Sequence, residues 1–583
     1  MLTRRSIMAI GALLVLTGAF VRSQARRPLA GADIDAIAQL LKIEDTRQFD
    51  DATLARLVQS PHPEVRRRAV QTIARVSSPA RSAVLMPARA DADAEVVATV
   101  AFAYGQAKDV DAVGWLREML LSKTAAAGVA QEAARSLGKI RSPEARAALV
   151  AYLSEAQATA ANAATAGEAL LALGRFPAPV DPGPIARWTN STDSEVRWRA
   201  AWALYRPRDP AAFAELLRMS RDASADVRFW AMRGLGASPP PSGRGARGAA
   251  PAPPPAPGPA MSEADRASAS TRLREGLSDP DRRVRTEALR ALATLDDEAA
   301  FDAVLGALDS PDSWLSVSAA ESLGRFASHA DQIVPRLIAA SAAGKPTALR
   351  ITALTPLTTI APDAAIALAA SLLHDPSTTA RASAVAALRR LGDGGRARLD
   401  AAVAADPALA ALVAPAGPRT PPPPAPARTD ADYRRLVTQW IVPAYDGAPG
   451  PHVVLSTPRG DVEIELYPGD APFGVEYMLD VIAAGDIVGT EFGRVVPNFV
   501  DQEGGIRRDA PRRDEVNRRG LTRGNLSWAS SGLDTGHPGY TLGITPQPHN
   551  EGDFTALGRV VRGMDVVDRI ELGDKITGAR VVK

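Results

Sequence analysis

The sequence contains no cysteine, which excludes disulfide bonds, thiolate metal ligands, a cysteine nucleophile and a lipid-modified N-terminal cysteine. Histidine is scarce, and the six histidines form neither a pair four residues apart nor a zinc-binding motif, so we expect no metal and no cofactor. Net charge is nearly absent, since 68 Lys and Arg oppose 66 Asp and Glu, and this balance argues against a nucleic-acid partner. Aromatic residues make up only 5% of the chain, which favours closely stacked, alanine-rich helices over a large β-sandwich.

The N-terminus has the pattern of an export signal in residues 1–25. Arg4 and Arg5 precede an uncharged apolar run over residues 7–20, and Ser23-Gln24-Ala25 offers a small-x-small cleavage site. The apolar run is shorter than the roughly 20 residues that span a bilayer. We therefore expect a periplasmic or secreted protein, exported by the general secretory or the twin-arginine route. The alternative is an inner-membrane anchor formed by an uncleaved signal, which would be the one membrane contact.

A repeated pattern occupies the middle of the chain. The four clearest copies have a turn, a small or acidic residue, valine followed by arginine, and then alanine, as in Val65-Arg66 with Ala69, and the remaining copies are weaker. Successive copies are separated by about 31–36 residues, apart from one interval that holds a proline-rich insert. The copies centre on Val65, Val96, Val129, Thr165, Val196, Val227, Val284, Val317, Leu349 and Ala380.

This pattern predicts paired amphipathic helices that bury their apolar stripes only by stacking on neighbouring pairs. The arginine is expected to pair with acidic groups of the adjacent unit. Over residues 35–413 the pattern resembles HEAT repeats in their short bacterial form. The resemblance implies an all-α solenoid that binds protein partners. Such repeats also occur in phycobilin lyases, but no residue of this sequence marks a bilin site.

Two proline-rich segments divide the chain. Residues 238–260 separate the first part of the array, 35–237, from the second part, 261–413. Residues 414–428 separate the array from a C-terminal domain over 429–583. Proline-rich segments of this kind are expected to be extended spacers without a packed core.

The C-terminal domain has the alternating patterns of short strands. Val462, Ile464 and Leu466 alternate with acidic residues, which predicts a half-buried strand. Many short strands with few helices predict a closed antiparallel β-barrel. The other expected elements are strands over 453–455, 492–500, 524–529, 540–544 and 557–561 and a helix over 473–484.

Four blocks of this domain resemble cyclophilin-type peptidyl-prolyl cis-trans isomerases. Residues 492–502, FGRVVPNFVDQ, are similar to the family signature F-H-R-x-x-P-x-F-x-x-Q. Residues 523–532 resemble the R-G-x-L-S-M-A-N-x-G strand, and 558–567 resemble the G-x-V-x-x-G-M-x-V-V ending. The opening block is 457–466. The resemblance implies isomerase activity on X-Pro bonds of proline-containing polypeptide clients.

The resemblance also implies roles for particular residues. Arg494 would donate to the prolyl amide as its conjugation is lost, Phe499 would form the floor of the proline pocket, and Gln502 would hold the substrate carbonyl. No nucleophile is needed, because the enzyme has only to bind the twisted amide more tightly than the planar one. The expected substrate-binding residues are Ala529, Ser530, Thr541, His549 and Phe554.

Several positions depart from the family pattern. Gly493 replaces the usual histidine, and Glu503 interrupts the usual Gln-Gly-Gly-Asp. Gly539 and Thr541 replace the glutamine and phenylalanine of the pocket wall, and His549 stands where tryptophan is common. These changes affect the rate and the sequence preference more than the fold, and the missing tryptophan predicts weak cyclosporin binding.

Two functions remain open at this point. The first is a prolyl isomerase for exported proteins whose HEAT repeats act as a protein-binding scaffold that gathers clients. The second is a non-catalytic protein whose degenerate pocket only grips proline-containing segments. A third idea is that the domain isomerises the proline-rich segments of its own chain.

Overall fold

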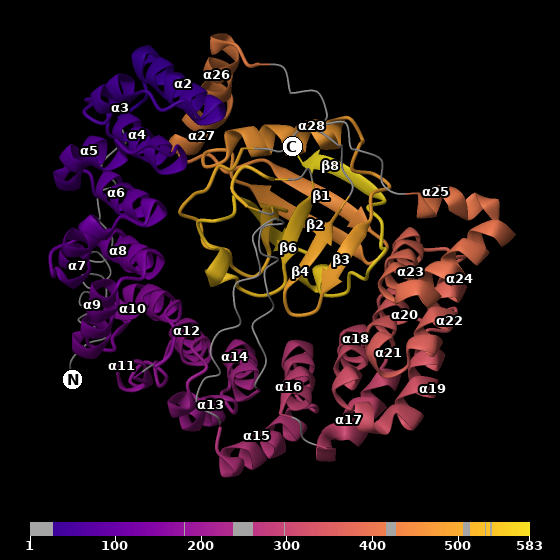
Figure 1. The fold of residues 1–583 in the computed structure, drawn as a ribbon. Helices are drawn as coiled ribbons and strands as arrows, with labels where there is room; N and C mark the ends of the chain where they lie inside the picture. The colour runs from indigo at the N-terminus through magenta and orange to yellow at the C-terminus, as the bar shows by residue number, and fades with distance from the viewer. Residues whose placement is uncertain are drawn as a thin grey trace, which may run out of the picture.

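The computed structural model describes residues 27–582 except 180, 237–260, 296–297, 415–426, 505–512, 531 and 537–538. The expected signal in residues 1–25, the segment 238–260 and most of 414–428 lie outside the described residues. Helices occupy the first three quarters of the described chain, and a β-sheet with a few helices occupies the remainder (Figure 1).

One row of the helical array faces the C-terminal domain, and each helix of this inner row packs against the next. Every copy of the repeat pattern lies in one of these helices, which confirms the periodicity found in the sequence. The inner row consists of α4 (Pro63–Arg75), α6 (Ala94–Ala107), α8 (Ala127–Ile140), α10 (Ala160–Leu173), α12 (Ser194–Tyr205), α14 (Ala225–Leu235), α16 (Arg282–Thr294), α18 (Ser313–Ser322), α20 (Thr347–Thr352) and α23 (Thr378–Arg390).

A second set of helices backs this inner row and buries its apolar faces against it. Most of its members precede or follow an inner helix directly in the chain, as stacked helical pairs require. The set consists of α2 (Gly31–Thr46), α3 (Asp51–Leu57), α5 (Arg81–Leu85), α7 (Val113–Leu121), α9 (Pro143–Glu155), α11 (Gly183–Ala186), α13 (Phe213–Met219), α15 (Glu263–Gly276), α17 (Phe301–Gly306), α19 (Ala330–Ala340), α21 (Leu354–Ile360), α22 (Pro362–Leu372), α24 (Gly392–Ala405) and α25 (Ala410–Val413).

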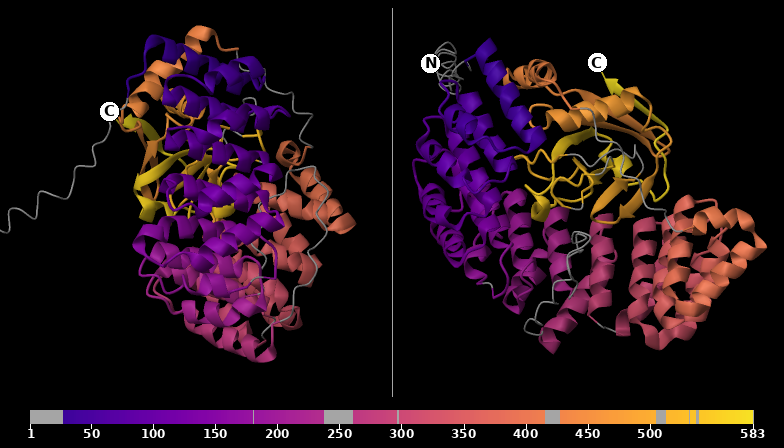
Figure 2. Two further views of the ribbon diagram at one scale, coloured as in Figure 1. Left: turned by 90° about the vertical axis from the view of Figure 1, so that its left-hand side faces the viewer. Right: turned by 45° about the horizontal axis from the view of Figure 1, so that its top comes forward.

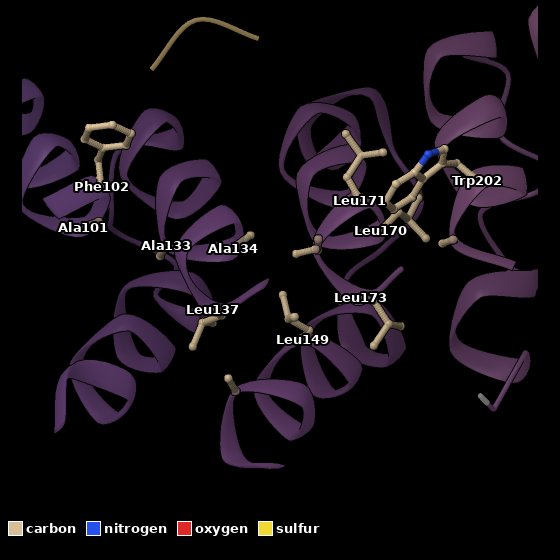
Figure 3. Close-up of a cluster of buried hydrophobic side chains, with 14 of the residues drawn as sticks. Ala101, Phe102, Ala133, Ala134, Leu137, Leu149, Leu170, Leu171, Leu173 and Trp202 are labelled. Carbon is tan, nitrogen blue, oxygen red and sulfur yellow. The ribbon is translucent and has the colours of Figure 1, made fainter. Parts of the chain in front are cut away.

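Small residues set the spacing of the inner helices. Ala101 of α6 and Ala133 of α8 are fully buried. Leu137 of α8 and Leu170 of α10 are buried in the same cluster (Figure 3). A Cβ atom on Gly138 would lie 2.6 Å from the Cα atom of Ala172, so α8 and α10 touch through their backbones. Alanine and glycine at these positions therefore allow the tight stacking on which the repeat depends.

The arginine of the repeat pattern forms the ion pairs expected between neighbouring units. Each guanidinium group reaches the acidic residue at the turn of the next unit and makes short, charge-assisted hydrogen bonds. The pairs are Arg66–Asp91 (2.6 Å), Arg197–Asp222 (2.8 Å), Arg228–Asp279 (2.8 Å) and Arg285–Asp312 (2.9 Å).

The C-terminal domain is a curled antiparallel sheet with strand order β3-β4-β6-β5-β7-β2-β1-β8. The expectation of a closed barrel is wrong: in the described residues β3 and β8 form no ladder, and the two ends are joined by the isolated bridge Glu491–Lys575 and a few backbone hydrogen bonds beside it. The strands are β1 (His452–Thr457), β2 (Gly460–Leu466), β3 (Phe492–Val496), β4 (Val500–Glu503), β5 (Asn525–Trp528), β6 (Tyr540–Gly543), β7 (Ala556–Arg562) and β8 (Gly578–Val582). The helices are α28 (Pro472–Ala483) and α29 (Met564–Val567).

The single strand expected over 492–500 is also wrong, because a turn divides it into β3 and β4. Asn498 adopts a φ of 63°, in the left-handed region that interrupts a strand and that asparagine tolerates better than most residues. Strand β8 and the helices before β1, α26 (Asp430–Leu436) and α27 (Val442–Tyr445), were not expected.

The array curves around the sheet, so that its two ends both touch the C-terminal domain (Figures 1 and 2). At the N-terminal end α2 packs against α26, and the Tyr433 hydroxyl donates to a carboxylate oxygen of Asp45 at 2.9 Å. At the other end the hydroxyls of Thr378 and Thr379 donate to Glu491 at 3.0 and 2.9 Å. The isomerase-like domain is therefore held within the curve of its own repeat array.

Candidate functional site

The β3–β4 hairpin brings together the three residues expected to be catalytic. Arg494 and Gln502 are cross-strand neighbours, and the Arg494 guanidinium donates to Gln502 Oε1 at 3.2 Å. The guanidinium carbon of Arg494 lies 5.4 Å from the ring centroid of Phe499, which follows the turn between the strands. A planar cation thus lies beside an aromatic floor, with the amide of Gln502 holding its orientation.

Two of the five expected substrate-binding residues, His549 and Thr541, lie beside the residues of the hairpin. The His549 ring is stacked on Phe499 with ring centroids 6.2 Å apart. Thr541 is the cross-strand neighbour of Gln502, and its hydroxyl lies 3.1 Å from that of Ser527. The roles of these side chains in binding substrate stay predictions.

The other three expected residues lie at the ends of neighbouring elements. Ala529 is buried and its amide donates to the carbonyl of Gly539 at 2.9 Å. Ser530 follows Ala529 and is half-buried, and Phe554 is half-buried at the end of the segment that carries His549. The part of these three residues in the site also remains a prediction.

Two departures from the family pattern are structurally linked. A Cβ atom on residue 539 would lie 2.4 Å from the carbonyl oxygen of Glu503. The backbone that carries the inserted acid therefore fills the space that a side chain at position 539 would need. Glycine at 539 therefore fits against the end of β4, and this position contributes no side chain to the pocket wall.

The array contacts the site directly, which the sequence did not indicate. The Asn498 amide donates to the carbonyl of Arg283 at 2.9 Å and to Glu287 Oε2 at 3.0 Å, and Arg290 donates to the carbonyl of Pro497 at 2.9 Å. The β3–β4 turn therefore rests on α16. These pairs are separated by about 200 residues in the chain, so no local sequence pattern could reveal them.

The segment that carries His549 rests on the first half of the array. Arg175 donates to the carbonyl of Pro548, and Gln106 donates to the carbonyl of Gly552 at 2.6 Å. Burial, and then the positive charges of Arg206, Arg175 and Arg233, lower the pKa of His549 to about 3. His549 is therefore neutral at physiological pH and offers the pocket an uncharged ring.

A second buried contact fixes the segment that follows residue 512. Arg75 of α4 forms an ion pair with Glu44 at 2.6 Å and donates to the carbonyls of Val516 and Asp470 at 2.9 and 2.7 Å. Burial raises the pKa of Glu515 to about 7, although its carboxylate accepts bonds from two backbone amides of α28. The array thus supplies hydrogen-bond donors to backbone carbonyls in two loops of the domain.

The described residues hold no group of three or more histidine, aspartate or glutamate side chains placed to bind a metal ion. In the described part of the chain, no helix is both long and apolar enough to cross a membrane.

Comparison with known proteins identifies the two parts of the chain. The family model described as cyclophilin type peptidyl-prolyl cis-trans isomerase/CLD matches residues 452–583. The model described as HEAT repeats matches residues 50–122, 82–167, 155–236 and 270–340.

Curated relatives match the same C-terminal region. Peptidyl-prolyl cis-trans isomerase A of Dickeya dadantii is 32% identical over 143 residues, covering 22% of this chain and 75% of the relative. Peptidyl-prolyl cis-trans isomerase of Helicobacter pylori is 32% identical over 135 residues, covering 21% and 83%. Peptidyl-prolyl cis-trans isomerase B of Bacillus subtilis is 34% identical over 128 residues, covering 21% and 90%. The chain belongs to the cyclophilin-type peptidyl-prolyl cis-trans isomerase family, and its catalytic domain follows an array of HEAT repeats.

Proposed function

We propose that this protein is an exported prolyl isomerase that acts on X-Pro bonds of client polypeptides while its catalytic domain is held inside the HEAT array. The observation that carries the proposal is the grouping of Arg494, Gln502 and Phe499 on one hairpin, with the bond and ring contact described above. It is supported by the family of the domain and by the pattern of residues 1–25.

The geometry suggests how the reaction is accelerated. A proline ring packed on Phe499 places its amide beside Arg494, whose N–H groups can donate to the prolyl nitrogen as that atom loses conjugation. The uncatalysed barrier is about 18–20 kcal/mol, and it arises from the double-bond character of the amide. A hydrogen bond from a charged donor contributes about 1.5–3 kcal/mol, which corresponds to about a tenfold to hundredfold rate increase. The apolar floor adds to this by removing water, which favours the less polar twisted amide.

In this proposal the inner row of the array holds the catalytic domain, whereas the sequence predicts a scaffold that gathers clients. Its inner row already contacts the hairpin turn, the His549 segment and the residues after 512, so much of this face is occupied by the chain's own domain. We therefore assign the inner row to holding the domain. Partner proteins would bind the second set of helices, which faces away from the domain.

A non-catalytic proline-binding protein is the second candidate, and one observation favours it. Position 539 has no room for a side chain, and Thr541 is smaller than the phenylalanine usual in the family, so the pocket wall is incomplete. Such a pocket could hold a proline without distinguishing the twisted amide from the planar one.

Exchange spectroscopy by NMR on a short peptide with one X-Pro bond separates the two candidates. Catalysis by the full chain gives exchange cross-peaks between the cis and trans forms, and Arg494→Ala removes them. The matched control is Arg562→Ala, which removes an exposed arginine of the same domain. Shifted peptide signals without exchange, in the unmodified chain, would establish a binding protein and overturn the proposal.

The proposed export is tested in a separate experiment. Residues 1–30 are fused to a reporter enzyme that is active only outside the cytoplasm, and reporter activity is expected. Arg4→Lys combined with Arg5→Lys abolishes that activity if the twin-arginine route is used and preserves it if the general route is used. An inactive reporter in both fusions would contradict export.

A further inference from the structure

A row of basic side chains runs along one edge of the array, at the C-terminal ends of successive inner helices. Lys108 caps α6, Arg141 caps α8, Arg175 follows the end of α10, and Arg206 caps α12. Lys139 lies in the last turn of α8. The favourable interaction of a cation with a helix C-terminus accounts for one such residue at each helix end. It does not account for their convergence on one cavity.

These five cations line a cavity of about 200 Å³ between the array and the His549 segment. His549 and Asp553 belong to the same lining, and Asp553 is its one carboxylate. Lys108, Arg141 and Asp553 are exposed to solvent, so the cavity is open on that side. The remaining lining residues are Gly105, Gln106 and Gly138.

Within the described part of the chain, none of the five cations forms an ion pair. Arg175 donates to a backbone carbonyl, and Lys139 hydrogen-bonds the amide of Gln106. Arginines elsewhere on the inner row are paired, as in Arg135–Glu168 at 2.7 Å and Arg233–Glu287 at 2.8 Å. Glu551 and Asp553 act electrostatically on both Arg175 and Lys139, so these two buried cations are partly compensated. Lys108, Arg141 and Arg206 have only Asp553 as a carboxylate within the lining, so an excess of positive charge remains there.

The cavity adjoins the proline pocket through a shared side chain. The His549 ring is stacked on Phe499 on the pocket side and lines the basic cavity as well. The ring centroids of His549 and Phe499 are 6.2 Å apart, about the length of two residues of extended chain. A residue that flanks a proline on Phe499 is therefore close to the wall that His549 forms for the cavity.

We propose that this cavity binds an acidic side chain of the client, so that the array makes the isomerase selective for prolines flanked by aspartate or glutamate. The proposal rests on the proposed function for the position of the proline. It assigns to the repeat array a binding surface that forms part of the substrate site, with carboxylate as the ligand chemistry.

The test uses the full chain and two peptides that differ only in glutamate or glutamine at the residues flanking one proline. The isomerisation rate and the dissociation constant are measured for each peptide. The unmodified protein is expected to bind and turn over the glutamate peptide about tenfold better, which corresponds to 1.4 kcal/mol. This preference should shrink at high salt, because the cavity is open to solvent.

The variant Arg141→Gln with Arg206→Gln should lose most of the preference and retain its rate on the glutamine peptide. A control with the same change in charge, Arg117→Gln with Arg390→Gln, replaces exposed arginines remote from the cavity and should retain the preference. Equal affinities for the two peptides in the unmodified protein, or a preference that the cavity variant retains, would overturn the inference. Tighter binding of the glutamate peptide without isomerisation would overturn the proposed function alone.

Discussion

Removing the Arg75 side chain should loosen the docking of the catalytic domain in the array. The guanidinium is 2% exposed, forms an ion pair with Glu44 at 2.6 Å, and donates to the carbonyls of Val516, Asp470 and Glu515 at 2.9, 2.7 and 3.1 Å. Arg75→Ala leaves Glu44 buried without its cation and removes a donor from three carbonyls, of which that of Glu515 keeps Asn517 as a partner. Breaking a buried ion pair by removing one partner costs about 3–5 kcal/mol.

The assay is urea unfolding followed by intrinsic fluorescence, with the free energy taken from the first transition because a chain of this size need not unfold in one step. Glu44→Gln in the Arg75→Ala background should recover part of the loss, since it removes the unpaired charge. The control is Arg56→Ala, an exposed arginine of the same repeat whose replacement should change stability by at most about 0.5 kcal/mol. A loss below about 1 kcal/mol for Arg75→Ala, or equal losses for Arg75→Ala and Arg56→Ala, would refute the reasoning.

Three further predictions concern chemistry, pH and packing. Arg494→Lys keeps the charge but loses the planar donors, so kcat/KM on an X-Pro peptide should fall by about tenfold or more, with an unchanged circular dichroism spectrum. Burial raises the pKa of Glu515 from 4.5 to about 7. The protonated side chain therefore contributes fully to the free energy of unfolding below about pH 4.5, and this contribution is lost as the pH rises through 7. The loss is on the order of 3 kcal/mol. Urea midpoints should fall over this range, and Glu515→Gln should flatten the curve; an unchanged slope would contradict the assignment. Gly138→Ala should cost about 1–3 kcal/mol because α8 and α10 touch there, whereas Gly114→Ala, with open space around it, should be neutral or stabilising; equal thermal shifts would count against the packing argument.

The repeat array could be predicted closely from the sequence because its signal is local and recurs. The clearest copies carry their own turn, apolar stripe and arginine, and the structure places every copy in an inner helix. Arginines of the clear copies, such as Arg66 and Arg197, form the expected ion pairs to the next unit. The strands of the catalytic domain were also largely predictable, since Val462, Ile464 and Leu466 show the period of a strand with one buried face.

The errors have physical reasons. Pro497-Asn498 is a pair typical of turns, but the apolar residues on both sides of it favour a strand, so the pattern predicts one continuous strand where the structure has a turn at Asn498. The open sheet was taken for a closed barrel because closure depends on pairing between strands far apart in the sequence. The contacts of α16 with Pro497 and Asn498, and the basic cavity beside His549, join segments that no local pattern relates.

The most direct test of the account is the cis-to-trans rate of a short X-Pro peptide in the presence of the full chain and of its Arg494→Ala variant. The account predicts clear acceleration by the full chain, with the catalytic domain still docked in the array, and loss of most of that acceleration in the variant. A rate equal to that of the free peptide, or acceleration that persists without the Arg494 side chain, would contradict it.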